Sequence, residues 1–507
     1  MNSTIGGMLA ATARQLPGKI AVICDDRPIT YQELNARVNQ IAHGFLHRGM
    51  DRQSRIATLM HNSVELVEIY FALAKAGMVG IPLNVRLTAP ELCYMIDHSD
   101  ATALILGGEF ASTLNQLRPR LSKVEHVITV GDEYPNGGEF YNLYRNQSTH
   151  EPDIKVNADD ESFIIYTSGT TGKPKGVVLT HNNHMWNTIN YTIAYPMEAS
   201  DVELALTPMF HSSTLGRIFT YIFAGATLIT SKRFDPVQAM ELIGTYKVTS
   251  ITQTPTMYAA LLNLKAKDSH HTETVKRVVT GAAPVSPKMK GEIAQLFTHA
   301  GVFDLYGLTE ASPGVTILRP NDPPDKTASV GKPMMSVEVK IVGDDGGQLP
   351  PGKIGNVVCR GPNVMKGYYK DLPSTQEVLR DGWLYTGDLG MMDGDGYLYL
   401  TGRKKELIIS GGDNIYPAEI EAVLQQHPFI LEAAVIGVPD KYWGESVKAI
   451  VVTKSGKTMT EREVIDYCKS RLASYKKPTS VAFIDALPKN AAGKVMKDEL
   501  LKRYPSH

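Results

Sequence analysis

The most informative stretch of the chain reads Tyr166-Thr167-Ser168-Gly169-Thr170-Thr171-Gly172-Lys173-Pro174-Lys175-Gly176. It lies between two apolar runs, Ser162–Ile165 and Val177–Leu179, so we expect a loop that joins two strands. A loop dense in glycine and hydroxyl residues directs several N–H and O–H groups at one point, which suits phosphate oxygens. Either Lys173 or Lys175 adds a full positive charge. The stretch therefore predicts a phosphate-binding loop, with a flexible surface turn as the alternative.

The loop differs from the phosphate loop of kinases and GTPases, which needs the pattern Gly-x-x-x-x-Gly-Lys-Ser/Thr. Pro174 follows the pair Gly172-Lys173, so no hydroxyl is placed there for a magnesium ion. Thr167 stands where the first glycine of that pattern would be. We therefore expect a different class of phosphate loop.

Over most of the chain, short β-rich runs alternate with longer amphipathic stretches. This alternation indicates an α/β protein built around mostly parallel sheet. Predicted strands include Ser162–Tyr166, Asp201–Pro208, Ala226–Thr230, Val248–Thr252 and Val275–Thr280, and predicted helices include Tyr31–Gly49 and Ser63–Ala76.

From about Val337 onward, the predicted strands become short and are separated by Gly, Pro and Asp turns. This pattern is typical of a small antiparallel sheet or barrel. After Lys405, about a hundred residues hold their own helices and strands, which is enough for a separate small domain. The predicted elements of this half are Val337–Val342, Gly355–Arg360, Tyr397–Thr401, Pro417–Gln426, Glu432–Val438, Val447–Lys454 and Glu461–Leu472.

The composition is that of a folded, soluble protein. Hydrophobic residues make up 43% of the 507 residues, and a net charge of -1 argues against a large nucleic-acid-binding surface. The four cysteines, Cys24, Cys93, Cys359 and Cys468, are scattered, which argues against a zinc site or a disulfide framework. We recognise no secretory leader and no membrane-spanning run, so a cytoplasmic location is expected.

The phosphate loop resembles the signature loop of the adenylate-forming superfamily, which holds acyl-CoA synthetases, peptide-synthetase adenylation domains and beetle luciferases. Six further segments resemble this family in order and spacing, and the resemblance covers essentially the whole chain. These segments are Gly281–Pro284, Tyr306–Glu310, Tyr385–Asp388, Gly402–Lys405, Gly411–Glu421 and Pro488–Lys494. Gly361–Tyr369 looks most like bacterial fatty-acyl-CoA synthetases.

The resemblance implies a large N-terminal domain, residues 1–402, with two mostly parallel sheets, packed helices and a small β-barrel-like subdomain. It also implies a small mobile α+β C-terminal domain, residues 403–507. The implied reaction joins a carboxylic acid to the α-phosphate of ATP with Mg²⁺, releases pyrophosphate and passes the acyl group to coenzyme A. Because two anions meet, cations and hydrogen-bond donors are expected where the charge concentrates.

The resemblance assigns an ATP and AMP site residue by residue. Asp388 would accept hydrogen bonds from the two ribose hydroxyls, with Arg403 beside it. The adenine and phosphate positions would be Thr167, Ser168, Gly169, Thr170, Thr171, Lys175, Gly281, Ala282, Ala283, Asp304, Tyr306, Gly307 and Thr309.

Three of the implied residues are catalytic. Thr309 would donate to the α-phosphate, Glu310 would hold the magnesium ion, and Lys494 would bridge the acid carboxylate and the α-phosphate. Without the family segments around them, Asp388 would be a turn residue, Glu310 a residue of a first helical turn and Lys494 a solvated lysine.

The second half-reaction needs a different face of the small domain. Lys405 lies at the implied hinge, about which this domain would rotate. The implied contacts with coenzyme A are Gly411, Gly412, Trp443, Tyr475 and Lys477, and the two glycines would let the backbone approach the pantetheine arm. A core tryptophan at position 443 and ordinary exposed lysines are the alternatives.

The implied acyl-binding residues are His211, Ser212, Leu215, Gly281, Gly307 and Pro313. His211 takes the place of the Asp that binds the substrate ammonium group in peptide-synthetase domains, so an amino acid is disfavoured. The mostly apolar segment Thr214–Ala226 favours an aliphatic or aryl acid. The resemblance places a medium- or long-chain fatty acid first and an aryl acid second.

Other functions stay open at this point: loading of a separate carrier protein, a luciferase-like oxygenase, and a nucleotide-binding scaffold without chemistry. Lys494, Thr309 and Glu310 argue against the scaffold. No nucleic-acid partner and no transmembrane segment are expected, whereas a homodimer and a peripheral association with a membrane remain open.

Overall fold

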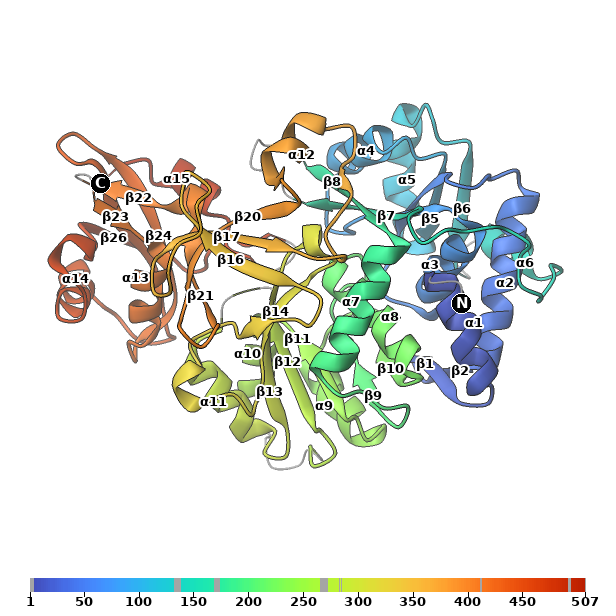
Figure 1. Cartoon of the computed structure of the whole chain (residues 1–507), viewed down its shortest axis with the longest axis horizontal. Coiled ribbons are helices and arrows are strands. Elements are labelled where there is room, and N and C mark those ends of the chain that lie inside the picture. The colour runs from blue at the N-terminus through green and yellow to red at the C-terminus, as the bar shows by residue number, and fades with distance from the viewer. Residues whose placement is uncertain are drawn as a thin grey trace. The chain divides into compact units, whose positions relative to one another are not determined.

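The computed structural model describes residues 4–131, 138–167, 174–264, 272–281, 283, 285–410, 413–490 and 494–506 (Figure 1). The chain forms two units. The first comprises Met1–Pro324, Gly331–Glu338 and Arg360–Leu384, and the second comprises Asp325–Val330, Val339–Cys359 and Tyr385–His507. The second unit contains all of residues 403–507, and the predicted domain boundary after residue 402 stays a prediction.

A nine-stranded sheet of the first unit has the order β15-β14-β13-β12-β11-β9-β10-β1-β2. The pairs from β13 through β12, β11, β9 and β10 to β1 are parallel, and β2, β14 and β15 join antiparallel. Its strands are β1 Ile20–Cys24, β2 Arg27–Thr30, β9 Val202–Leu204, β10 Thr227–Thr230, β11 Ser250–Gln253, β12 Arg277–Gly281, β13 Gly301–Gly307, β14 Gly314–Leu318 and β15 Lys332–Pro333.

The second sheet of this unit has seven strands in the order β18-β8-β7-β4-β3-β5-β6. Its β3, β4, β5, β6 and β7 are parallel, whereas β8 pairs antiparallel with β7 and with β18. The strands are β3 Arg55–Leu59, β4 Val79–Pro82, β5 Ala103–Gly107, β6 His126–Val130, β7 Glu161–Thr167, β8 Lys175–Thr180 and β18 Gly367–Tyr368. The predicted mostly parallel α/β architecture is confirmed.

Helices cover both sheets of the first unit. Residues of α9, α10 and α11 form one core cluster with the nine-stranded sheet, and residues of α4 and α5 form another with the seven-stranded sheet. The described helices are α1 Ile5–Gln15, α2 Tyr31–His47, α3 Val64–Ala76, α4 Ala89–His98, α5 Ala111–Leu117, α6 Gly138–Tyr144, α7 His181–Ala194, α8 Ser212–Ala224, α9 Pro236–Thr245, α10 Pro255–Leu262, α11 Pro287–Leu296 and α12 Leu372–Val378. Short 3-10 turns lie at η1 Gly108–Phe110, η2 Arg118–Arg120, η4 Thr309–Ala311 and η5 Pro324–Lys326.

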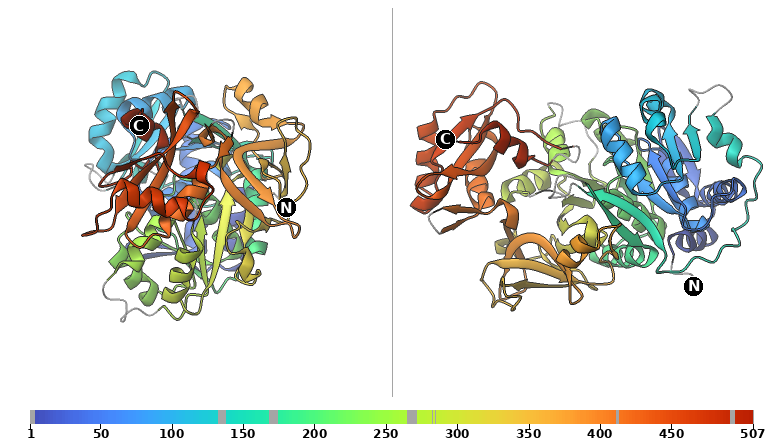
Figure 2. Two further views of the ribbon diagram at one scale, coloured as in Figure 1. Left: turned by 90° about the vertical axis from the view of Figure 1, so that its left-hand side faces the viewer. Right: turned by 90° about the horizontal axis from the view of Figure 1, so that it is seen from above.

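The second unit contains a small α+β core, coloured red in Figure 2. Its sheet has the order β23-β22-β25-β24, with β26 beside β25. Helices α13 and α14 pack in one apolar cluster with this sheet and α15 in another. The elements are β22 Ile408–Ser410, β23 Asp413–Ile415, β24 Ile430–Asp440, β25 Gly444–Thr453, β26 Ser480–Phe483, α13 Pro417–Gln425, α14 Glu461–Lys469, α15 Lys497–Arg503, η6 Lys404–Glu406 and η7 Ser474–Lys476.

A third sheet lies in the region from about Val337 onward, where short strands separated by turns were predicted. It has the order β16-β17-β20-β19, with β21 beside β20, and the pairs β19/β20 and β20/β21 are antiparallel. Its strands are β16 Glu338–Val342, β17 Gly355–Arg360, β19 Leu379–Arg380, β20 Trp383–Met392 and β21 Leu398–Arg403. The predicted small antiparallel sheet is therefore present.

One predicted strand is too long, and its end leads into the site. Strand β9 stops at Leu204, whereas Asp201–Pro208 was expected. Ala205 still donates to the Ile229 carbonyl of β10 at 2.9 Å, but beyond it buried Asn62 bonds the chain: its amide donates to the Thr207 carbonyl at 3.0 Å and its oxygen accepts from the Met209 N–H at 2.8 Å. Among the described residues, no helix is both long and apolar enough to cross a bilayer.

Candidate active site

The order of the parallel strands brings the predicted acid-binding residues to one edge of the nine-stranded sheet. Neighbouring parallel strands point the same way, so β9, β11, β12 and β13 all end at this edge. The segment after β9 leads to His211 and Ser212, β12 ends at Gly281 and β13 ends at Gly307. Ligands of open α/β sheets bind outside the carboxyl ends of the strands.

Two glycines at this edge allow backbones to come close together. A Cβ atom on Gly307 would lie 1.8 Å from the Pro313 carbonyl oxygen, and one on Gly281 would lie 2.7 Å from the Leu305 carbonyl oxygen. Both positions therefore need glycine. Pro313 also packs against α8, where a Cβ on Gly216 would meet the proline ring at 3.4 Å.

Thr309 and Glu310 begin the 3-10 turn η4, directly after β13. The Thr309 hydroxyl lies 3.1 Å from the hydroxyl of Ser212, so a predicted phosphate contact and a predicted acid contact are neighbours. Fully buried Asn363 fixes the turn by donating to the carbonyls of Ala311 at 2.7 Å and Gly314 at 2.8 Å.

Tyr368 connects Glu310 with the phosphate loop. Its hydroxyl donates to Glu310 Oε1 at 2.8 Å, and the ammonium of Lys175 lies 5.1 Å from the centre of its ring. Burial, together with the Glu310 charge, raises the pKa of Tyr368, so the phenol remains a donor. Lys175 also donates to the Ser374 hydroxyl at 2.8 Å.

Antiparallel pairing of Thr167 with Lys175 closes the base of the phosphate loop. The other predicted loop residues, Ser168, Gly169, Thr170 and Thr171, lie outside the described residues, as does Ala282 of the adenine site. Ala283 is half-buried just after β12. Asp304 of β13 forms a buried ion pair with Lys290 at 2.6 Å, and Tyr306 is buried.

We call the carboxyl ends of β9, β11, β12 and β13, where the predicted acid-binding residues lie, the acid edge. This region is more polar than the sequence suggests. Gln253, the last residue of β11, is 2% exposed, and neither atom of its amide has a hydrogen-bond partner among the described residues. The same holds for the hydroxyls of Thr280 on β12 and Ser312 and for Nε2 of His211. Burial lowers the pKa of His211 to about 4, so its ring is neutral near pH 7.

Helix α8, which carries Ser212 and Leu215, has two unlike sides. Phe219 packs edge-on against Phe71 with ring centres 5.5 Å apart and also contacts Phe163. On another side, the Thr214 hydroxyl bonds to that of Thr207, and the Tyr221 hydroxyl bonds to that of Ser250, the first residue of β11, both at 2.8 Å. The apolar residues of α8 thus largely fill the protein core.

The predicted ribose site and the predicted catalytic lysine belong to the second unit. Asp388 on β20 pairs in register with Arg403 on β21, and their side chains form an ion pair at 3.1 Å. Asp388 is therefore a strand residue and not a turn residue. Lys494 is exposed. Lys405 lies exposed in η6.

Among the predicted coenzyme A contacts, Trp443 is 60% and Tyr475 is 49% exposed, so the alternative of a core tryptophan is wrong. Lys477 donates to the Ser474 carbonyl at 3.2 Å. Gly411 and Gly412 lie outside the described residues.

Comparisons with known proteins decide the family. The model of the AMP-binding enzyme family matches residues 9–369, and that of the AMP-binding enzyme C-terminal domain matches residues 419–494. The chain belongs to the AMP-binding enzymes. It is an ATP-dependent acid–CoA ligase of the adenylate-forming kind, which uses ATP, Mg²⁺ and coenzyme A.

Relatives of this AMP-binding enzyme act on different acids. A feruloyl-CoA synthase from Amycolatopsis sp is 37% identical, with 99% of each chain covered. A long-chain-fatty-acid–CoA ligase from Mycobacterium tuberculosis is 34% identical, with 99% of this chain and 98% of the relative covered. The ATP-bound structure of MatB from Rhodopseudomonas palustris superposes with a TM-score of 0.93 at 32% identity and covers 100% of this chain and 99% of its own.

The residues of this AMP-binding enzyme are suited to a magnesium ion that is bound jointly by the protein and the phosphates of ATP. Among the described residues, no group of three or more His, Cys, Asp or Glu side chains could hold a metal alone. Mg²⁺ in nucleotide sites is held by one or two carboxylates together with substrate phosphates and water. Glu310 is the carboxylate predicted for this role, and one of its oxygens accepts a hydrogen bond from Tyr368.

Two further residues of this AMP-binding enzyme, Tyr368 and Gln253, lie beside predicted site residues without having been predicted themselves. Tyr368 lies within the segment Gly361–Tyr369, which was used only for its family likeness. Gln253 gave a weak signal, a polar residue at the end of a predicted apolar strand. The contact of Tyr368 with Glu310 and the position of Gln253 at the acid edge both depend on the order of the strands in the sheets.

Proposed function

We propose that this acid–CoA ligase activates an aromatic acid that carries a polar ring substituent, as a hydroxylated arylalkenoic acid does. The buried amide of Gln253 carries the proposal, because it lies at the acid edge and both its atoms lack partners among the described residues. An unpaired buried polar group costs about 1–3 kcal/mol. A phenolic or ether oxygen can pair with such an amide, whereas a methylene chain cannot.

The relatives support the same substrate class. The feruloyl-CoA synthase is the more similar of the two sequence relatives described above, at 37% against 34% identity. The neutral ring of His211 and the hydroxyl of Thr280 add two more polar groups for a substituted ring. Leu215, fully buried on α8, would contact the apolar part of the acid.

A medium- or long-chain fatty acid is the second candidate. The resemblance of Gly361–Tyr369 to fatty-acyl-CoA synthetases placed it first, the mostly apolar segment Thr214–Ala226 suits an aliphatic or an aryl acid, and the mycobacterial relative is named for a long-chain fatty acid. Within Thr214–Ala226, Phe219 is not free to contact an acyl chain, since it already packs against Phe71 and Phe163 in the core.

In the first half-reaction, a carboxylate oxygen of the acid attacks the α-phosphorus of ATP, and pyrophosphate leaves. The backbone and hydroxyls of the phosphate loop, with Lys175, would hold the β- and γ-phosphates, and Thr309 would donate to the α-phosphate. Glu310 would hold Mg²⁺, which neutralises phosphate charge when bound. Lys494 would add positive charge where the two anions meet.

In the second half-reaction, the thiolate of coenzyme A attacks the acyl carbonyl and AMP leaves. Asp388 and Arg403 would hold the ribose through both steps. Rotation about Lys405 would withdraw Lys494 and present Trp443, Gly411 and Gly412 to the pantetheine arm. Tyr475 and Lys477 would contact the nucleotide of coenzyme A.

A panel of acids tests the substrate class. CoA-dependent thioester formation would be measured as kcat/KM for C2 to C18 fatty acids and for aryl acids with and without a ring hydroxyl. We expect a hydroxylated aryl acid to exceed its unsubstituted analogue and every fatty acid by about tenfold or more. A maximum among C12 to C18 acids would instead support the fatty acid. Transfer only to a carrier-protein thiol would contradict the coenzyme A step.

A further inference from the structure

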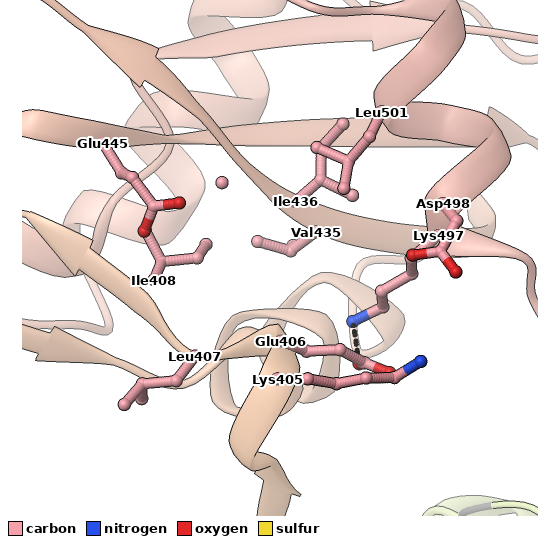
Figure 3. Close-up of a pocket in the computed structure, with 11 residues that line it drawn as sticks. Lys405, Glu406, Leu407, Ile408, Val435, Ile436, Glu445, Lys497, Asp498 and Leu501 are labelled. Carbon is pink, nitrogen blue, oxygen red and sulfur yellow. Dashed lines mark ion pairs between the residues drawn. The ribbon is translucent and has the colours of Figure 1, made fainter. Parts of the chain in front are cut away.

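A buried lysine in the second unit connects three elements that lie far apart in sequence. Lys497 forms ion pairs with Glu406 at 3.1 Å and with Glu421 at 2.7 Å (Figure 3 shows the Glu406 pair). The side chains are only 15%, 22% and 18% exposed for Lys497, Glu406 and Glu421. We call these three residues the ion triad.

The ion triad joins the two segments that matter for the proposed movement, the hinge segment η6 and the segment that carries Lys494. Glu406 ends η6 and directly follows Lys405, the proposed hinge residue. Lys497 begins α15, three residues after Lys494. Glu421 belongs to α13 and also accepts a hydrogen bond from the Val435 N–H of β24 at 2.8 Å, which anchors the triad to the sheet.

Glu406 and Lys497 are both charged near neutral pH. Burial pushes the pKa of Glu406 upward, but Lys497 outweighs this and lowers it. Burial pushes the pKa of Lys497 downward, but Glu421 and Glu406 outweigh this and raise it. The two directions agree, so Glu406 and Lys497 hold their charges in the folded unit.

Apolar packing beside the triad is incomplete. A cavity of about 80 Å³ opens between η6, the sheet and α15. Figure 3 shows Ile408, Val435, Ile436 and Leu501 around it, with Glu406 and Lys497 at its edge. Beside this unfilled space, the Lys497–Glu406 ion pair joins η6 to α15 directly.

We propose that Lys497 is a positioning residue for adenylation: the ion triad ties the hinge segment to the segment that carries Lys494, so both move as one body. The inference rests on the proposed roles of Lys405 and Lys494. The face proposed for coenzyme A needs no such tie, since β22 follows η6 directly and Gly411 follows β22. Loss of the triad should therefore impair one half-reaction and spare the other.

The test replaces Lys497 with Met, which keeps the length and removes the charge. Two rates would be measured: acid-dependent exchange of labelled pyrophosphate into ATP, and thioester formation from supplied acyl-adenylate and coenzyme A. We expect the Lys497→Met exchange to fall at least tenfold and its thioester formation to stay within about threefold. Lys497→Arg should restore exchange, and Glu406→Gln should reproduce the loss.

Arg503→Met is the matched control, because it removes an ion pair with Glu499 within the same helix. It should leave both rates unchanged. Undiminished exchange in Lys497→Met, or an equal fall of both half-reactions, would overturn the proposal. Lys494→Ala is measured in parallel: if it loses exchange while Lys497→Met keeps it, only the triad inference fails. If Lys494→Ala also keeps exchange, the proposed function fails.

Discussion

The two units prepare for substrate in opposite ways. At the acid edge of the first unit, Gln253 and Thr280 are buried without hydrogen-bond partners among the described residues. In the second unit, the charged residues near the hinge are paired with one another, as in the ion triad and in Asp388–Arg403. Lys494 is exposed beside them.

This difference suits two tasks, selection of the acid and movement of a charged segment. Unpaired polar groups in a fixed sheet edge select a ligand that completes their hydrogen bonds. When a group of charged residues is paired within one part of the protein, that part can move without breaking the pairs. No partly buried ion is then left without its partner. In the proposed function, the unpaired groups of the first unit would select the acid, and only the segment after Lys405, which carries Lys494, would move between the two half-reactions.

The largest expected effect on the first unit follows from Glu310→Gln. The amide is a poor ligand for Mg²⁺, so charge on the phosphates stays uncompensated as pyrophosphate leaves. We expect pyrophosphate exchange to fall about 100-fold or more, without recovery in excess Mg²⁺. An activity within threefold of the unmodified enzyme would remove Glu310 from the metal site.

Gln253→Leu sharpens the contrast at the acid edge. The variant loses the amide that would pair with a ring substituent, so kcat/KM for a hydroxylated aryl acid should fall about 30-fold. The unsubstituted analogue should change by less than about threefold, and it serves as the control within the same protein. An equal fall in kcat/KM for both acids would show that Gln253 supports the fold and does not bind the ring substituent.

Tyr368→Phe tests the orientation of Glu310 separately from its charge. The ring under Lys175 remains, but the hydrogen bond to Glu310 is lost. The Mg²⁺ concentration for half-maximal exchange should rise about tenfold, as for other partners of metal ligands, with a near-normal rate at saturation. An unchanged Mg²⁺ midpoint would rule out the orienting role.

Acid pH should distinguish the units by stability. Burial lowers the pKa of His181 to about 4 and that of His184 to about 3. Unfolded histidines titrate near 6.5. Below that pH the unfolded histidines bind protons but the folded ones do not, so these two residues lower the free energy of unfolding of the first unit as the pH falls.

At pH 5.5 this loss is about 1 kcal/mol per buried histidine relative to pH 7. Glu406 has a lowered pKa, so its contribution to the second unit is present above the ordinary glutamate pKa and is lost only as the pH falls through its folded value. Urea unfolding at pH 7 and 5.5 would check this. His184→Phe should flatten the acid loss of the first unit.

Local pattern was sufficient to predict most of the fold. Strand β17 matches its prediction at both ends, and α2 and α3 differ from theirs only by one or two residues at an end. Strand β9 was overestimated because an apolar run does not reveal that Asn62, far away in sequence, bonds the chain at Thr207 and Met209. Such side-chain contacts depend on the assembled fold.

The candidate site was harder to predict where it depends on strand order. Gln253 lies at the acid edge only because β11 is inserted between β12 and β9. Tyr368 meets Glu310 across 58 residues of sequence, through the pairing of β18 with β8. Thr309 and Ser212 were predicted for different ligands, and their 3.1 Å contact needed the structure.

The most direct measurement uses Lys494→Ala in the two half-reactions. Acid-dependent pyrophosphate exchange should fall at least 100-fold, because the cation that joins the two anions is gone. Thioester formation from supplied acyl-adenylate and coenzyme A should persist within about threefold of the unmodified rate, since that step makes no use of Lys494. Exchange at the unmodified rate would contradict the account, because the second unit would then contribute no charge to adenylation.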